Sequence, residues 1–486
     1  MTESIADIAL NVARLAHAEY ADVRVIEMQK ESIVVKNGKL ESAQRSNSTG
    51  FGVRVLIDGS WGFSSSREKS SREAESVARE AVAIGRASRL AQRKKVRLAP
   101  SVVVQDRWVT PFLKDPFPVS LDEKLLLLDG AVSRLRSVPG VNIAEGFMNF
   151  WKREQQFKST EGSEIEQSTV FSGAGMSATS IKNGEIQTRS YPNSARGQYQ
   201  AGGYEVVRSM GLLENAERIA SEAVALHSAR QCPAGEMDLI LDGSQLALQI
   251  HESCGHPAEL DRALGSEINF AGTSFLTPEK RGNFRYGSEI VNLVADATQH
   301  SSPGGLGTFG YDDEGAPAQC VALVRDGIFV GYLSSRETAS EIGCRSSGAM
   351  RASSWNRIPL VRMTNVSLLP GNSSLEEMIA STDSGILMCT NRSWSIDDRR
   401  LHFQFGTEIG WLIKNGKRAE MVKNPTYSGV TSRFWGGCDA IGGQKEWVIW
   451  GTPNCGKGQP EQIMHTGHGA SPSRFRRVSV GVAYGG

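Results

Sequence analysis

HESCGHPAELD, residues 251–261, is the stretch that decides the local fold, because it places two imidazoles and a carboxylate within six positions. On a regular α-helix residues i and i+4 share a face, whereas His251 and His256 are five apart and would diverge by about 140°. Pro257 follows directly and cannot donate to the carbonyl of Ser253. We therefore expect a π-turn or an unwound turn that brings both imidazoles to one side.

These side chains are the types that a catalytic zinc site uses. Imidazole nitrogens suit zinc, and the adjacent carboxylate of Glu252 suits a general base. A catalytic zinc commonly takes three protein ligands and one water, so a third ligand must come from elsewhere. Cys254 lies between the two histidines and is expected to point away from the metal. From the residues alone the remaining candidates are Cys438 and Cys455, both expected in Gly-rich loops, and His465 and His468, both expected on surface loops.

Composition favours an ordinary globular protein with neither nucleic acid nor a membrane as its partner. The 486 residues carry a formal net charge of +1 and contain no long uncharged apolar stretch, and no signal peptide is predicted. Seven cysteines in so long a chain do not predict a disulfide framework, so a cytoplasmic location is expected. The basic cluster within residues 86–97 is interpreted as a solvated helix end.

Periodicity predicts helices and hairpins in alternation. Residues 4–18, 68–92 and 211–229 have the pattern of helices, and Ser120 with Glu123 favours another helix start. Residues 141–204 alternate in the manner of strands. The 51 glycines also indicate many turns. The predicted turn dipeptides are Asn37-Gly38, Asp58-Gly59, Glu161-Gly162, Asn183-Gly184, Asp326-Gly327 and Asn415-Gly416.

A domain boundary is predicted near Cys232–Gly235, where Pro233 interrupts the helical pattern before a fresh strand at 238–241. Ser244 is expected to cap the helix that carries His251, and Ser374 with Glu377 to cap a later one. The predicted fold class is α+β with two domains, 1–232 and 233–486. Mainly antiparallel sheets with flanking helices are expected, in an N-terminal sheet domain and a β-rich C-terminal domain.

The chain resembles the TldD/PmbA metallopeptidase family, and specifically its metal-bearing TldD branch. The family pattern is His-Glu-x-x-x-His followed by an acidic pair, which Glu259 and Asp261 match. The segments that carry the resemblance are GFGVRVLIDGSWGFSSS at 50–66, HESCGHPAELD at 251–261, YDDEGAPAQ at 311–319, VRMTNVSLLPG at 361–371, EIGWLIKNGK at 408–417 and NCGKGQP at 454–460.

The resemblance implies a role for each residue of the site. His251, His256 and Cys455, the last from the Cys-Gly-Lys motif, are implied as ligands of one zinc ion per chain, and Glu252 as the catalytic carboxylate. A His/His/Cys set also favours zinc over iron or manganese on chemical grounds. Glu259 and Asp261 are expected either to orient His256 or a nearby loop, or to have a plain solvated or capping role.

The implied activity is hydrolysis of peptide bonds in unfolded or short peptides, including leader peptides or peptide conjugates, by a metal-activated water with Glu252 as general base. The resemblance also implies a chamber formed by a homodimer, or by a heterodimer with a metal-free PmbA-like paralogue, with residues 1–232 supplying the substrate channel and dimer contacts. TNRSWSIDDRR at 390–400 departs from the family pattern. This departure keeps open an amide hydrolase acting on a non-peptide conjugate. A second alternative, suggested by the metal-free branch of the family, is a non-catalytic scaffold subunit.

Overall fold

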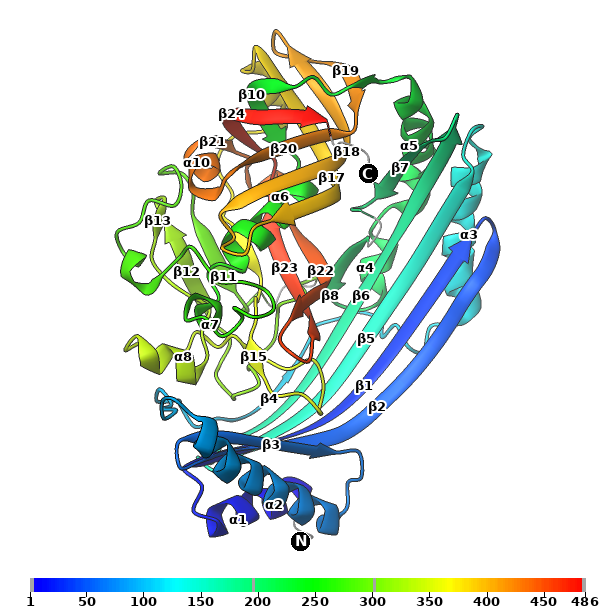
Figure 1. The fold of residues 1–486 in the computed structure, drawn as a ribbon. Helices are drawn as coiled ribbons and strands as arrows, with labels where there is room; N and C mark the ends of the chain where they lie inside the picture. Colours follow the sequence, from blue (N-terminus) through cyan, green and yellow to red (C-terminus); the bar gives the residue numbers. More distant parts are fainter. Residues whose placement is uncertain (1–3, 195–196, 300–302, 483–486) are drawn as a thin grey trace.

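Two large, mostly antiparallel sheets with helices packed against them make up most of the molecule (Figure 1). The computed structural model describes residues 4–194, 197–299 and 303–482. The predicted α+β class, with mainly antiparallel sheets and flanking helices, is confirmed.

The first sheet has long, curved strands in the order β3-β2-β1-β5-β6-β4, with β7 and β8 pairing to β6. β4 is parallel to β6, and the other neighbours are antiparallel. The strand bounds are β1 (Tyr20–Lys36), β2 (Lys39–Ile57), β3 (Ser60–Ser66), β4 (Gln105–Val109), β5 (Ile143–Ser159), β6 (Glu164–Lys182), β7 (Glu185–Tyr191) and β8 (Gln198–Ala201).

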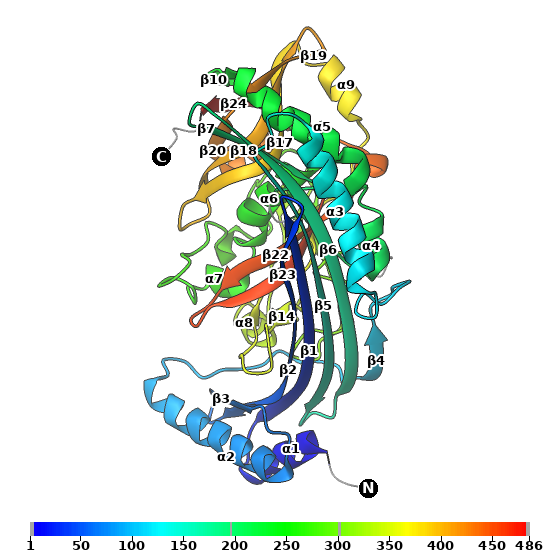
Figure 2. The same cartoon turned by 90° about the vertical axis from the view of Figure 1, so that its right-hand side faces the viewer.

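Helices cover two separate parts of this sheet, because its strands bury apolar residues at both ends. α1 and α2 pack at one end of the sheet, and α3 and α5 pack on its outer face near the other end (Figure 2). The C-terminal half of the chain occupies the opposite face (Figures 1 and 2). The helix bounds are α1 (Ile5–Leu15), α2 (Ser71–Ser88), η1 (Arg89–Ala91), α3 (Leu121–Ser137), α4 (Tyr204–Arg208), α5 (Leu212–Ala225) and η2 (Leu226–Ser228).

The Asn-Gly and Asp-Gly dipeptides form the hairpin turns that the sequence predicts. Asn37 and Gly38, for example, have φ values of 52° and 74°, as a type I′ turn requires. Positive φ at both turn residues also occurs at 58–59, 183–184, 326–327 and 415–416. These turns fix the register of strands as long as β1 and β2.

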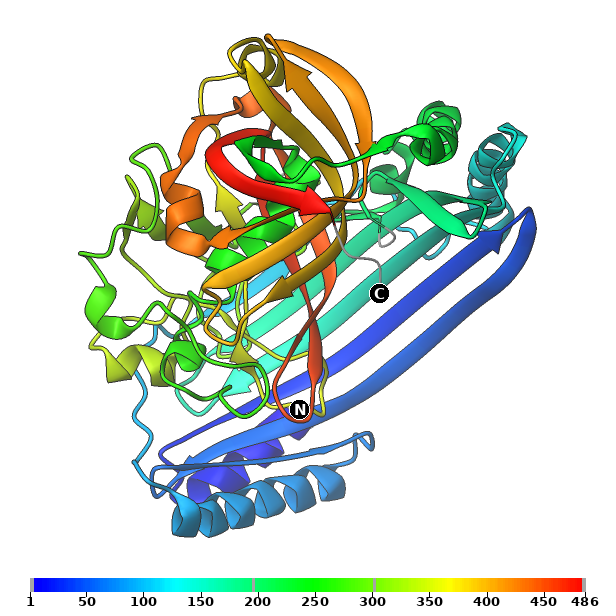
Figure 3. The ribbon, with the colours of Figure 1, turned by 45° about the horizontal axis from the view of Figure 1, so that its top comes forward.

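Five strands of the second sheet close into a ring. The order β17-β10-β24-β20-β18 returns to its start because β17 also pairs with β18, and Figure 3 shows these strands curling round. β19 and β9 extend from β18, and β21 pairs with β24. The strand bounds are β9 (Arg230–Gln231), β10 (Gly235–Leu241), β17 (Ser384–Ile396), β18 (His402–Lys414), β19 (Lys417–Lys423), β20 (Pro425–Val430), β21 (Cys438–Ile441) and β24 (Ser473–Val482).

Smaller elements complete the C-terminal half of the chain, among them a four-stranded sheet in the order β13-β12-β11-β16 and a hairpin between the two large sheets (Figure 1). The hairpin of β22 (Val448–Lys457) and β23 (Gln462–Ala470) lies there, beside the inner face of the first sheet (Figure 1). The other strands are β11 (Leu293–Asp296), β12 (Cys320–Arg325), β13 (Ile328–Phe329), β14 (Met350–Arg351), β15 (Leu360–Val361) and β16 (Val366–Leu368). The helices are α6 (Gly243–Ile250), η3 (His251–Gly255), α7 (Leu260–Ala263), η4 (Pro278–Lys280), α8 (Arg336–Glu341), α9 (Leu375–Ala380), α10 (Thr431–Gly436) and η5 (Gln444–Glu446).

Two details differ from the sequence predictions or leave them open. α6 is capped by Asp242, whose carboxylate accepts from Gln245 N–H at 2.9 Å, so the predicted cap Ser244 is wrong by two positions. The division at residue 232 stays a prediction, because β9 on its N-terminal side already pairs in the second sheet.

The predicted capping box of Ser374 and Glu377 is confirmed. Among the helices described, none is long and apolar enough to span a membrane.

Gly62 tests the packing of α2 on β3. A Cβ at this position would lie 1.9 Å from the Ala81 carbonyl oxygen, so the helix would have to move away from the strand. We expect Gly62→Ala to reduce the free energy of unfolding by about 1–3 kcal/mol, the usual cost of overpacking. Gly436→Ala is the control, since its Cβ would meet nothing within 4 Å. Thermal unfolding of both variants measures this, and equal stabilities would contradict it.

Candidate metal centre

A π-turn brings His251 and His256 to the same side of the helix. α6 ends at Ile250, and the His256 N–H then donates to the His251 carbonyl at 3.1 Å, a bond across five residues. The two rings consequently lie 4.8 Å apart between centroids, with their planes at 85°. The π-turn predicted from the spacing and from Pro257 is confirmed.

Buried side chains replace the hydrogen bond that Pro257 cannot make. The Ser253 carbonyl accepts the Tyr286 hydroxyl at 2.9 Å, and the Ser253 hydroxyl accepts from Trp435 Nε1 at 2.9 Å. On the same turn, Gly255 lies against Met363, whose sulfur would be 2.0 Å from a Cβ at Gly255. The turn is therefore held by a satisfied polar network and by close packing.

Cys455 on β22 completes a group of three donors with the two histidines. The donor atoms of His251, His256 and Cys455 all lie within 4.8 Å of one another, and all three side chains are buried. Cys455 Sγ is 3.6 Å from His256 Nε2. Two tetrahedral zinc ligands, a thiolate and an imidazole, are also about 3.6 Å apart. The donor set therefore fits a zinc ion.

Hydrogen bonds define which ring nitrogen of His251 and of His256 is free to bind a metal. His468 Nδ1 lies 3.0 Å from the Val366 carbonyl oxygen and must donate to it, so His468 Nε2 accepts from His251 Nδ1 at 2.8 Å. This leaves His251 Nε2 unprotonated. His256 Nδ1 donates to Glu259 Oε2 at 3.0 Å, which leaves His256 Nε2 unprotonated as well. Both imidazoles thus present the nitrogen that a metal requires.

Glu259 and Asp261 lie in a buried charge network behind His256. Lys457 Nζ is 2.8 Å from Asp261 Oδ1 and 3.4 Å from Glu259 Oε2, and the lysine side chain is fully buried. Burial opposes ionisation of Glu259, but Lys457 and His256 hold its pKa well below the ordinary value. The solvated role considered for this acidic pair is wrong, because both carboxylates are buried.

The protonation of the three donors also favours metal binding. Burial lowers the pKa of both His251 and His256, so the rings are neutral at neutral pH. Burial opposes ionisation of the Cys455 thiol, yet the Arg362 guanidinium brings its pKa below the ordinary value. Neutral imidazoles and an accessible thiolate are the forms that bind zinc.

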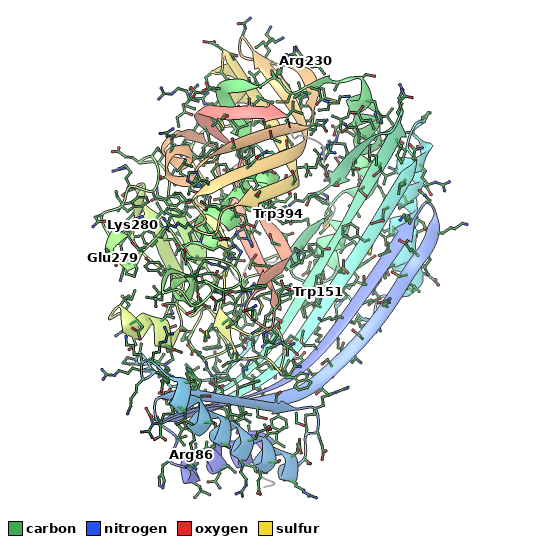
Figure 4. All side chains as sticks on the ribbon, viewed as in Figure 1. Arg86, Trp151, Arg230, Glu279, Lys280 and Trp394 are labelled. Atoms are coloured by element: carbon green, nitrogen blue, oxygen red, sulfur yellow. The ribbon has the colours of Figure 1, made fainter. Side chains whose placement is uncertain are left out.

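Glu252 faces a cavity of about 340 Å³ that the three donors also line. Its Oε2 accepts from Arg400 Nη1 at 2.7 Å, and its Oε1 makes no hydrogen bond to any residue in the described ranges. Arg400 has a left-handed backbone with φ of 62°, and its side chain is mostly buried. Trp394, labelled in Figure 4, lines the same cavity. The unusual segment 390–400 therefore forms part of the wall of this cavity.

The structure corrects several predicted positions. His465 and His468 lie on β23 and not on surface loops, and His468 is fully buried against His251. Cys438 and Cys455 lie on strands β21 and β22 and not in loops. Among the described residues, the candidate metal group contains neither Cys438 nor His468.

Comparison with known proteins identifies the family to which the chain belongs. Residues 234–481 match the model of the PmbA/TldA metallopeptidase C-terminal domain, and residues 21–85 match domain 1 of the same family. A metalloprotease of Methanocaldococcus jannaschii is 30% identical over 412 residues, which are 85% of this chain and 87% of that protein. A zinc metalloprotease TldD homologue of Saccharolobus solfataricus is 27% identical over 198 residues, 41% of this chain and 42% of that protein.

Solved structures share the fold along nearly the whole chain. TldE from Thermococcus kodakarensis has a TM-score of 0.74 at 15% identity, and the match covers 98% of this chain and 100% of that one. A crystal structure of a Thermotoga maritima protein gives a TM-score of 0.76 at 17% identity, covering 98% of both chains.

Removing the Cys455 thiol tests the donor set. Cys455→Ala deletes one of three ligands, so we expect the zinc content of the purified protein to fall from about one ion per chain to a small fraction. Cys438→Ala is the matched control, because it removes another buried thiol that is not among the three donors. Elemental mass spectrometry measures both variants. Zinc retained at the wild-type level in Cys455→Ala would contradict the assignment.

Proposed function

Because this chain belongs to the PmbA/TldD metallopeptidase family, we propose that it is a zinc-dependent peptidase that hydrolyses peptide bonds in short or unfolded peptides. The observation that carries this proposal is the convergence of His251, His256 and Cys455 on one cavity that also contains the Glu252 carboxylate. A catalytic zinc takes three protein ligands drawn from residue types that include His and Cys, and keeps one position for water or substrate. One zinc ion per chain is proposed.

Each residue of the chain has a distinct part in the proposed reaction. His251, His256 and Cys455 would hold the zinc, which would supply a more acidic water and a Lewis acid for the scissile carbonyl. Glu252 accepts the proton of the attacking water and delivers it to the leaving amine, so Oε1, free of other partners, is the acting oxygen. His468 and Glu259 fix the orientation of the two imidazoles.

Arg400 positions the general base. Its guanidinium donates to one oxygen of Glu252 and also to the Ala271 carbonyl, which holds the carboxylate at the wall of the cavity. A base fixed in this way loses little conformational freedom when a substrate arrives. The strained backbone of Arg400 is consistent with a residue whose position is functionally constrained.

An extended peptide held as an added β-strand is the proposed form of the substrate, including leader peptides or peptide conjugates. The proposed working unit is a dimer that encloses the cavity, either of two identical chains or with a metal-free paralogue of PmbA type. The likeness in fold to a protein named TldE supports a partner of the same architecture. A cytoplasmic location is proposed, because Cys455 must stay reduced to bind zinc.

A second candidate is amide hydrolysis of a non-peptide conjugate. It is favoured by Trp394 and Arg400, which belong to the unusual segment 390–400 and line the metal cavity. A bulky ring beside the reactive centre would suit a compact conjugate. A purely structural subunit, the third alternative, is disfavoured by the complete donor set.

Glu252→Gln tests the proposed chemistry. The substitution keeps the shape of the side chain but removes its basicity, so we expect hydrolysis to fall by about 10²–10⁴-fold while zinc content stays unchanged. A library of unstructured peptides and a set of small amide conjugates, analysed by mass spectrometry, give the readout. Glu376→Gln on the surface helix α9 is the control. Turnover by Glu252→Gln at the wild-type rate would refute the assigned role, and cleavage confined to the conjugates would favour the second candidate.

A further inference from the structure

A second and larger cavity adjoins the metal cavity. It has a volume of about 520 Å³ and lies between the inner face of the first sheet and the β22–β23 hairpin. Pro453 and Glu461 line both cavities, so the two meet at this hairpin. Figure 4 labels Trp151 on the long sheet, which lines this second cavity, and Trp394, which lines the metal cavity.

The lining of the second cavity carries more positive than negative charge. Its cations are Lys30, Lys152, Arg153, Arg351 and Arg357, and its carboxylates are Asp312, Asp313 and Glu461. Lys152 is paired with Asp115 at 3.4 Å and Arg153 with Asp313 at 2.9 Å. Within the described part of the chain, Lys30, Arg351 and Arg357 form no ion pair with a carboxylate. Three cations thus remain available to an anion.

Arg351 is the most informative of these three cations. Its side chain is buried, with 8% of the residue exposed, yet both of its hydrogen bonds use Nη1 and go to the carbonyls of Met363 and His465. Its guanidinium lies over the Phe309 ring at 5.3 Å. Burial lowers the pKa of Arg351 to about 9. A buried guanidinium without a carboxylate partner is costly unless a ligand supplies the missing charge.

His465 is a second indication of positive potential in this cavity. It lies against Trp151 and Phe171, with ring centroids 4.7 and 5.4 Å away. Burial, together with Arg351, Lys30 and Arg153, lowers its pKa to about 3. These three cations come from three different elements, and the charge of each disfavours protonation of the same ring.

The two aspartates of the YDDE segment are already engaged by the protein. Asp312 accepts from the backbone N–H groups of Glu314, Ala316 and Met350, and burial beside Glu314 raises its pKa to about 8. Asp313 accepts from Arg153 and from the Ala352 N–H. Neither carboxylate forms an ion pair with Lys30, Arg351 or Arg357, although the charge of Asp313 acts on Arg351 and partly offsets the effect of burial on its pKa.

We propose that this second cavity is a substrate subsite that binds a carboxylate of the peptide through Lys30, Arg351 and Arg357. The aromatic walls formed by Trp151 and Phe171 would contact the neighbouring apolar parts of the same peptide. The carboxylate belongs either to an acidic side chain or to the C-terminus of the peptide. This inference rests on the proposed peptidase function, and it adds the class of peptide that the site prefers.

Binding to an inactive protein tests the subsite without requiring turnover. Zinc-loaded Glu252→Gln is titrated calorimetrically with three N-acetylated, alanine-rich heptapeptides. The first is an amide with one central glutamate, the second is the same amide with glutamine there, and the third is the glutamine peptide with a free C-terminus. We expect at least one peptide with a carboxylate to bind about tenfold more tightly than the neutral amide. Which of the two does so identifies the source of the carboxylate.

Removing single positive charges tests whether the cations of this cavity cause the preference for a carboxylate. Lys30→Gln and Arg357→Gln, each added to Glu252→Gln, should abolish the preference and leave the dissociation constant of the neutral amide unchanged. Both side chains are at least partly exposed, so neither change is expected to prevent folding. Lys182→Gln is the matched control, since it removes an exposed lysine at the far tip of β6. Equal dissociation constants for all three peptides, no binding of any peptide, or equal weakening of all three by the variants would overturn the proposal.

A parallel hydrolysis assay separates this inference from the function beneath it. If the wild type cleaves none of the peptides while Glu252→Gln keeps the charge preference, the subsite stands and the peptidase proposal falls. If the wild type cleaves the neutral amide and no charge preference exists, the peptidase stands and the subsite falls.

Discussion

The π-turn at His251–Gly255 is the constraint on which the metal site depends. Without the five-residue bond from His256 N–H to the His251 carbonyl, the two imidazoles would point in different directions. A turn this wide is held by Tyr286 and Trp435, which bond to Ser253, and by Met363, which packs on Gly255. The surrounding core therefore sustains a local winding that the helix alone would not keep.

The β22–β23 hairpin connects this turn to the rest of the molecule. It presents Cys455 to the two histidines and His468 to the back of His251. Arg362 donates to the carbonyls of Cys455 and Gln462 and so ties the two hairpin strands together from within the core. The other side of the hairpin borders the cationic cavity, so one element forms a wall of both proposed binding regions.

Local features of this protein could be predicted from the sequence, and long-range contacts could not. The Asn-Gly turns and the π-turn follow from φ preferences and from Pro257, which act within a few residues. His468 was one of the candidate ligands, but its contact with His251 could not be predicted, because strand register brings the two together across 217 residues. Arg400 also had no local signal, since its contact with Glu252 depends on how the segment 390–400 meets α6 and η3. Lys457 belongs to the Cys-Gly-Lys motif, but that motif implied a role only for Cys455, as a metal ligand.

Anomalous X-ray diffraction at the zinc absorption edge tests the central claim most directly. Crystals of the protein purified with its native metal should show one strong peak per chain, about 2.0–2.3 Å from His251 Nε2, His256 Nε2 and Cys455 Sγ. The peak should disappear below the edge, which identifies the metal as zinc. A peak at any other place in the fold, or three donors in contact with one another and no peak between them, would contradict the account.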